Sequence, residues 1–251
     1  MTRKKFVSWH VRRSKDYRKL EWVNAGELLD VFIKFISPKK NEMILDLGTG
    51  AGKVAEAVYK KGAVVIGMDY SLDMLIQASR QIKFPIAWTQ GDANFLPFPD
   101  DTMNKISARM IFHHLVNPFK ALLECMRILK PGGKLFICEG IAPNKNSFRN
   151  WMRMNQLLEP GKKTFSPKIL ERLLIDAGFA KIKKKVVVTP QLSTKSWLKN
   201  RGDSLKIIKI VMEMRKKLSQ DEKKAWNLKE VRGDIFVDVP WLLIAGCKPR
   251  K

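Results

Sequence analysis

A glycine-rich turn between two apolar segments constrains the fold of this chain more than any other feature. Residues 43–47 are apolar apart from one aspartate, residues 48–52 have the sequence GTGAG, and residues 53–59 carry apolar side chains at helical spacing. This order predicts a β-strand, a tight turn and an α-helix. A second apolar segment, residues 63–68, is followed by Asp69 and is expected to form the next strand.

The same alternation of strand and helix continues along the chain. Helices are expected over residues 71–80 and 119–129, and strands over residues 85–89, 103–108 and 134–138. Strands and helices that alternate at this spacing indicate an α/β fold with a mainly parallel sheet. Sheets of this kind bind their ligands at the carboxyl ends of the strands, so the site is expected there.

Two phosphate-binding motifs that use such a turn do not fit this sequence. A dinucleotide motif would have glycine at the position of Lys53. A P-loop would have four residues between its glycines and a serine or threonine after the lysine. Here three residues separate Gly48 from Gly52, and Val54 follows the lysine. The turn therefore favours a nucleoside ligand that carries no phosphate.

Residues after the second and third strands fit an adenosyl ligand. Glycines in the turn let the backbone approach a nucleoside closely, and the Asp69 carboxylate can accept hydrogen bonds from both ribose hydroxyls. Asp92 can accept a hydrogen bond from the adenine amino group. The backbone N–H beside it, at Ala93, can donate to a ring nitrogen.

Five motifs, in order, resemble those of class I S-adenosylmethionine-dependent methyltransferases, and in particular the small-molecule group that includes the ubiquinone and menaquinone C-methyltransferases. They are ILDLGTGAG (44–52), VIGMDYS (65–71), QGDA (90–93), LPFPD (96–100) and LKPGG (129–133). The resemblance implies a Rossmann-like, doubly wound, seven-stranded sheet, mainly parallel with an antiparallel last strand, plus a helical cap and lid. It also implies S-adenosyl-L-methionine as the cofactor and S-adenosyl-L-homocysteine as the product.

The resemblance also implies cofactor contacts for individual residues. Asp46 and the glycine turn would lie along the methionine moiety, and Asp69 would hold the ribose. Tyr70 and Met74 would flank the adenine, and Arg109 would lie beside the methionine end. The full set is Asp46, Gly48, Thr49, Gly50, Gly52, Asp69, Tyr70, Met74, Asp92, Ala93 and Arg109.

Two histidines directly after the fourth strand are the first candidates for a catalytic role. Methyl transfer from a sulfonium is an in-line displacement, so the protein must align two reactants; it also needs a base when the nucleophile is a hydroxyl or a carbon acid. His113 and His114 should face the cofactor sulfur, or else cap and pack against the following helix. Glu139, after the fifth strand, is a second candidate base. No metal site is expected, because the three histidines form no cluster with ligand spacing.

The segments outside the central region are expected to cover it. Residues 1–40 are predicted to form an N-terminal helical cap, and residues 41–251 the methyltransferase domain, with lid insertions near 143–165 and 190–232. The residues expected to face the substrate or the lid are Tyr17 and Trp151. Within the second insertion, residues 203–218 have an amphipathic helical pattern. This pattern fits a lid packed on the domain, a helix on an anionic membrane, or a basic face along a nucleic acid.

Positive charge is concentrated outside the central region. The net charge is +24, from 48 Lys+Arg and 24 Asp+Glu, but residues 41–140 contribute only +1. The favoured function is methylation of a small, apolar or aromatic molecule at carbon or oxygen. The alternative is an RNA-modifying methyltransferase that binds the phosphate backbone with its basic flanks. Against RNA, residues 109–112 are RMIF, not the Asn/Asp-Pro-Pro-aromatic string found in the nucleobase-amine methyltransferases.

Neither a signal peptide nor a membrane span is expected from the sequence. No apolar run approaches the roughly 18–20 residues that cross a bilayer, and the first residues are basic rather than apolar. The three cysteines are odd in number and widely spaced, so reduced core residues are expected rather than disulfides. The protein is therefore expected to be cytoplasmic, with peripheral contact at an anionic membrane surface left open.

Overall fold

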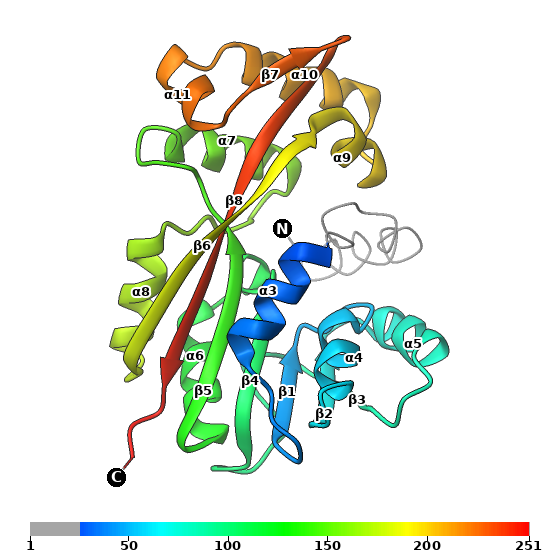
Figure 1. Ribbon diagram of the computed structural model, residues 1–251, viewed down its shortest axis with the longest axis vertical. Coiled ribbons are helices and arrows are strands. Elements are labelled where there is room, and N and C mark those ends of the chain that lie inside the picture. The colour runs from blue at the N-terminus through cyan, green and yellow to red at the C-terminus, as the bar shows by residue number, and fades with distance from the viewer. Residues whose placement is uncertain (1–25, 251) are drawn as a thin grey trace.

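One sheet, in the strand order β3-β2-β1-β4-β5-β8-β6, organises the chain (Figure 1). The computed structural model describes residues 26–250. Strands β1 to β5 are parallel, and β8 runs antiparallel to both β5 and β6. The strands are β1 (Met43–Leu47), β2 (Val64–Asp69), β3 (Ala87–Gln90), β4 (Met103–Arg109), β5 (Leu129–Gly140), β6 (Ala180–Ser193), β7 (Lys229–Val231) and β8 (Asp234–Cys247). The predicted fold class is confirmed, and the short β7, which pairs with β8, adds an eighth strand.

Helices cover both faces of the sheet, and the local sequence sets where several of them begin. The helices are α3 (Gly26–Ile36), α4 (Lys53–Tyr59), α5 (Leu72–Gln81), α6 (Pro118–Ile128), α7 (Phe148–Leu158), α8 (Pro167–Asp176), α9 (Thr194–Asn200), α10 (Leu205–Lys216) and α11 (Gln220–Ala225). The hydroxyl of Ser71 accepts a hydrogen bond from the backbone N–H of Met74, and Ser166 does the same for Ile169. Such N-caps satisfy backbone donors that the first helical turn leaves unpaired.

Each face of the parallel strands has its own hydrophobic core. Successive residues of a strand point to opposite faces, and on β1 the buried Ile44 belongs to one core and the buried Leu45 to the other. Phe32 of α3 packs in the first core and Leu122 of α6 in the second. Both faces are therefore covered, as parallel sheets require. The three cysteines are free, as expected.

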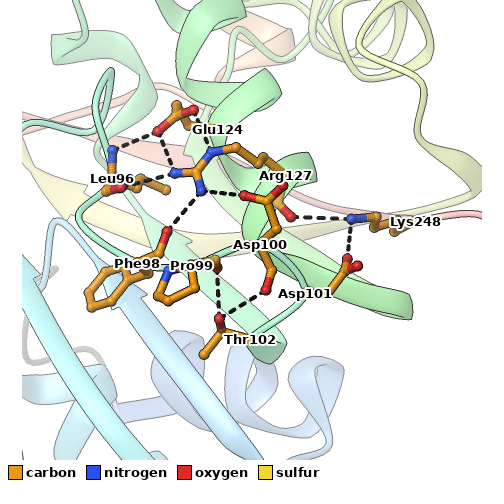
Figure 2. Close-up of polar contacts among 9 residues, drawn as sticks. All are labelled: Leu96, Phe98, Pro99, Asp100, Asp101, Thr102, Glu124, Arg127 and Lys248. Carbon is orange, nitrogen blue, oxygen red and sulfur yellow. Dashed lines mark hydrogen bonds and ion pairs between the residues drawn. The ribbon is translucent and has the colours of Figure 1, made fainter.

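Arg127 of α6 holds the loop that contains the LPFPD motif (Figure 2). Its guanidinium donates to the backbone carbonyls of Leu96 (3.0 Å) and Phe98 (2.8 Å), and to the carboxylates of Asp100 (2.8 Å) and Glu124 (2.9 Å). Glu124 also accepts from the backbone N–H of Leu96 at 2.8 Å. These bonds tie the return loop after β3 to α6, so the motif has a structural role.

Replacing Arg127 with alanine is expected to lower the free energy of unfolding by about 2 kcal/mol, because two backbone carbonyls and the Glu124 carboxylate lose their partner. Urea denaturation followed by circular dichroism measures the change. The control is Arg172→Ala: the Arg172 side chain is 75% exposed and pairs with Asp176 within α8, so its loss should stay below about 0.5 kcal/mol. Equal effects of the two substitutions would contradict the structural role of the Arg127 bonds.

The upper ends of β6 and β8 leave the parallel strands and carry a cap (Figure 1). This cap consists of α7, α9, α10 and α11 with β7, and it includes most of the two predicted insertions. The predicted helix over residues 203–218 is α10; Val211 and Met212 are buried, Ile207 and Ile208 are half-buried, and Ile210 is exposed. Part of its apolar side packs on the protein, as in the lid interpretation, and contact with a membrane or a nucleic acid stays a prediction. Among residues 26–250, no helix has the length and apolar character needed to cross a membrane.

Candidate active site

A pocket lies at the carboxyl ends of the parallel strands and continues under the cap. Its wall begins at Asp69, the last residue of β2, passes Gly48 after β1 and Glu139 on β5, and reaches Trp241 on β8 and Trp151 on α7. These residues follow the spatial order of the strands. The pocket therefore crosses from the glycine turn to the cap, as expected for this class of sheet.

The Asp69 carboxylate is fixed by the glycine turn at one end of the pocket. One oxygen accepts a hydrogen bond from the backbone N–H of Gly50 at 2.8 Å, and the other from that of Ser71 at 2.9 Å. Burial raises the pKa of Asp69, although these hydrogen bonds favour the charged form. A carboxylate has about four acceptor sites, so this one can still accept hydrogen bonds from a ligand's hydroxyl groups.

Two glycines of the turn serve different contacts. Gly48 has a φ of +69°, and a β-carbon there would lie 2.7 Å from the Ile111 side chain. At Gly52 a β-carbon would lie 2.5 Å from Ile82 and 2.8 Å from Trp88. Gly48 therefore lets the Ile111 side chain pack directly against the turn, whereas Gly52 allows the start of α4 to pack against the neighbouring elements.

The Asp46 carboxylate points into the protein beneath the turn. It accepts hydrogen bonds from the hydroxyls of Thr49 (2.7 Å) and Ser107 (2.9 Å) and from the backbone N–H of Ala55 (3.1 Å). Burial raises its pKa to about 6, and these hydrogen bonds and the Arg109 charge oppose the rise. Asp46 therefore stabilises the glycine turn from inside the protein.

His113 and Glu139 form a buried pair in the middle of the pocket wall. The Nδ1 atom of His113 lies 2.6 Å from one Glu139 oxygen, and the other oxygen accepts from the backbone N–H of Phe112 at 2.8 Å. His113 belongs to a short 3₁₀ helix, residues Phe112–His114, which brings both histidines to the pocket. Burial raises the pKa of Glu139, and the Lys162 charge and the backbone N–H groups of Phe112 and His113 oppose the rise. The Glu139 carboxyl group therefore holds the His113 ring in one orientation at the pocket wall.

Glu159, at the end of α7, is the centre of a buried ionic cluster. Its carboxylate lies 2.9 Å from Arg201, 3.4 Å from the Lys162 ammonium and 3.6 Å from Nδ1 of His114. Burial alone would raise the pKa of Glu159, but the charges of Lys162, His114 and Arg201 lower it well below its usual value. The cluster joins the cap to the histidine segment and keeps this carboxylate ionised.

Comparison with known proteins covers the part of the chain that contains the glycine turn, Asp69 and the two histidines. Residues 45–137 match the family described as "Methyltransferase domain". This segment is a methyltransferase domain. The chain resembles the class I S-adenosylmethionine-dependent methyltransferases of the menaquinone group, as its motifs indicated.

Three known proteins show the extent of the similarity. The demethylmenaquinone methyltransferase of Clavibacter sepedonicus is 36% identical over 110 residues, which are 43% of this chain and 45% of that protein. The crystal structure of YcgJ from Bacillus subtilis has a TM-score of 0.81 at 24% identity and covers 89% of this chain and 98% of that one. Phosphoethanolamine N-methyltransferase 2 from Haemonchus contortus, solved with phosphomonomethylethanolamine and S-adenosylhomocysteine, has a TM-score of 0.60 at 20% identity. It covers 89% of this chain and 53% of that one.

The structure sorts the predicted site residues of the methyltransferase domain and its cap into two groups. Those that line the pocket are Gly48, Gly50, Asp69, Tyr70, Met74, Arg109, His113, His114, Glu139 and Trp151. Those that lie outside its lining are Asp46, Thr49, Gly52, Asp92 and Ala93. One Asp92 oxygen accepts from the backbone N–H of Asn94 at 2.9 Å. Tyr17, and most of the predicted cap over residues 1–40, lie outside the described residues. The roles of all these residues in binding stay predictions.

The fold also brings Glu159 close to the two histidines, although it lies far from them in the sequence. Ligand atoms of His113, His114 and Glu159 lie within 4.8 Å of one another, although no sequence spacing indicated a cluster. The Glu159 carboxylate already faces Arg201 and Lys162, and their positive charges oppose a divalent cation at the same oxygens. We therefore interpret the trio as part of the ionic cluster rather than as a metal centre.

Proposed function

We propose that this chain transfers the methyl group of S-adenosyl-L-methionine to a small, apolar or aromatic molecule, at carbon or oxygen. The observation that carries the proposal is the His113–Glu139 pair, which lies between the glycine turn and the cap-covered end of one pocket. Methyl transfer needs two reactants aligned in a water-poor site and, for many nucleophiles, a base between them. The pocket is enclosed by the cap, and its wall contains His113 as a candidate base.

The residues at the lower end of the pocket fit the adenosyl cofactor. Asp69 would accept hydrogen bonds from the ribose hydroxyls, and Gly48 and Gly50 would let the backbone lie close to the ligand. Tyr70 and Met74 line the same end and would contact the adenine. When bound, the cofactor supplies an electrophilic methyl group on a sulfonium, and the protein's task is to hold the acceptor in line with it.

His113 is the proposed base. With a proton on Nδ1, its ring donates to the Glu139 carboxylate, and Nε2 is then the unprotonated nitrogen that would act as the base. Nε2 would then take the proton of an acceptor hydroxyl or activated carbon, and the electron pair left on that acceptor atom would be directed at the methyl group that the cofactor supplies. The imidazolium that forms is stabilised by the Glu139 carboxylate, which acts as a positioning group.

The upper end of the pocket fits a small acceptor better than a polymer. Its wall includes Trp151, Val237, Val239 and Trp241, each at most 9% exposed. The exposed lysines of the cap-bearing strands lie on the sheet edge instead, for example Lys184 on β6. Edge lysines also discourage pairing with other strands, so their presence does not by itself favour RNA.

Radiolabelled S-adenosylmethionine and fractionated cell extract test the proposed function. The purified protein should transfer label into the small-molecule or lipid fraction, and a His113→Ala variant should abolish most of that transfer. Label that enters RNA instead would support the alternative and overturn the proposed acceptor class. A folded protein that transfers label to no fraction would argue against the reaction itself.

Replacing Asp69 with alanine is expected to weaken S-adenosylhomocysteine binding by about 1–3 kcal/mol, because the ribose would lose hydrogen bonds to a charged acceptor. Isothermal titration calorimetry measures the change. The matched control is Asp73→Ala, because Asp73 is an exposed residue in the first turn of α5 and outside the pocket. Binding that is equal in the two variants would contradict the assignment of Asp69.

A further inference from the structure

We propose that the methyl acceptor carries an oxyanion, a carboxylate or a phosphate, on its apolar body, and that Arg215 of the cap binds this group. The inference rests on the proposed function, since it concerns the acceptor end of the same pocket. Arg215 would then determine specificity. The acceptor, described above only as small and apolar or aromatic, would carry a negative charge.

Arg215 is a buried cation that lacks an anionic partner. It lies near the end of α10, is 5% exposed and lines the pocket. Its Nε atom is enclosed and has no hydrogen-bond acceptor, and no carboxylate within residues 26–250 comes within 4 Å of its guanidinium. Asp234, which interacts with it at longer range, accepts instead from the Ser193 hydroxyl and from the backbone N–H of Lys195.

Three other cations of the pocket, Arg201, Lys162 and Lys163, already have acceptors. Arg201 donates to Glu159 (2.9 Å) and Asp203 (2.6 Å), and Lys162 lies 3.4 Å from Glu159. The Lys163 ammonium donates to the backbone carbonyls of Leu115 and Val116 at 3.0 and 2.9 Å. A buried charge is unfavourable unless it is paired. Arg215 differs from these three cations because it has no such partner among residues 26–250, so we expect the bound molecule to supply one.

Two further donors on the same cap wall lack acceptors. The indole N–H of Trp151 on α7 and the hydroxyl of Thr194 on α9 are enclosed and have no acceptor among residues 26–250, and both residues line the pocket. The Trp226 ring links this region, with its centroid 5.3 Å from that of Trp151 and 5.7 Å from the Arg215 guanidinium carbon. Three donors that lack acceptors match a ligand group rich in acceptors, and an oxyanion has that chemistry.

The walls around these donors define the rest of the acceptor. Trp151 and Trp241 contribute aromatic surface, and Val237 and Val239 contribute aliphatic surface. Burial also lowers the pKa of Arg215 to about 10, which still leaves it charged at neutral pH. An acceptor with an apolar or aromatic body and a terminal oxyanion therefore complements both the apolar walls and the Arg215 guanidinium at this end of the pocket.

Paired probes test the proposal on the full chain saturated with S-adenosylhomocysteine. The anions are 2-naphthoate and 2-naphthyl phosphate, and their neutral counterparts are 2-naphthamide and 2-naphthol, all titrated by calorimetry. At least one anion should bind about tenfold or more tighter than its counterpart, as a charge-assisted hydrogen bond predicts. Which anion is preferred distinguishes a carboxylate from a phosphate. No measurable preference for either anion would overturn the proposal.

Substitutions at Arg215 provide the second readout. Arg215→Met should abolish the preference for the anion, and it should raise the melting temperature of the free protein because an unpaired buried charge is removed. Arg215→Lys should keep part of the preference, since the charge remains and the planar fork is lost. Arg153→Met, at an exposed residue of α7, should change neither property.

The outcomes separate this inference from the proposed function. Retained anion preference in Arg215→Met, or a lowered melting temperature that points to a structural role, would overturn the assignment of Arg215. If Arg215→Met does not fold, Arg215→Lys with unchanged anion affinity would overturn it equally. Failure of the wild-type protein to bind S-adenosylhomocysteine would instead overturn the proposed function.

Discussion

Replacing His113 with alanine is expected to lower kcat by about 10²–10⁴-fold, the range for loss of a general base, with S-adenosylhomocysteine affinity changed less than about threefold. His113 is buried beside Glu139, and its Nδ1 lies 2.6 Å from that carboxylate, so its ring is held in one orientation. Single-turnover kinetics with the acceptor recovered from the labelled fraction measures the chemical step.

Two companion variants test the roles within this site. Glu139→Gln keeps the shape of the side chain and removes its charge. It should lower kcat by about 10–100-fold and move the acidic limb of the pH–rate profile, which follows deprotonation of the His113 ring, to lower pH, because the imidazolium loses a carboxylate that stabilises it. His114→Ala should lower kcat less than His113→Ala, because His114 faces Glu159. A larger loss in His114→Ala would transfer the role of base to His114.

The parallel half of the fold was predictable because its signals are local. The glycine turn and the apolar segments that alternate at strand and helix spacing each lie within a few consecutive residues, and the structure confirms the strands and helices that they predicted. The end of the pocket near Asp69 follows from the same motifs. Local patterns did not show that Asp46 turns inward to Thr49 and Ser107, because its partners are fixed only by the folded sheet.

The cap side of the site was not predictable, because its contacts join distant segments. Arg201 pairs with Glu159 across 42 residues of sequence. Neither residue lies in a local sequence pattern that indicates the other as its partner. The sequence does contain an indication that Arg215 is buried. It follows Val211 by four residues and Met212 by three, so it falls on the apolar side of the predicted helix. A charged residue in that position is buried or faces a cavity, and here it does both.

Replacing Glu159 with glutamine is expected to lower the free energy of unfolding by about 3–4 kcal/mol at pH 7, within the range for breaking a buried ion pair. The substitution leaves Lys162 and Arg201 buried without this carboxylate, although Arg201 keeps Asp203. Urea denaturation measures the change. The control is Glu213→Gln on α10, where a carboxylate that is 57% exposed pairs with Lys216. Its loss should stay below about 0.5 kcal/mol.

The pH dependence of the Glu159→Gln effect identifies its source. The folded-state pKa of Glu159 lies below its usual value of 4.5, so its stabilising contribution is present above that value and is lost as the pH falls through the folded-state pKa. The difference between wild type and variant should therefore shrink between pH 5 and pH 3. Asp46 and Glu139, whose pKa values burial raises, act in the opposite direction, because their contribution is lost as the pH rises. Both groups are present in wild type and variant, so they cancel in the difference to first order. A difference that stays constant down to about pH 3, below the usual Glu pKa, would mean that packing rather than charge gives Glu159 its effect.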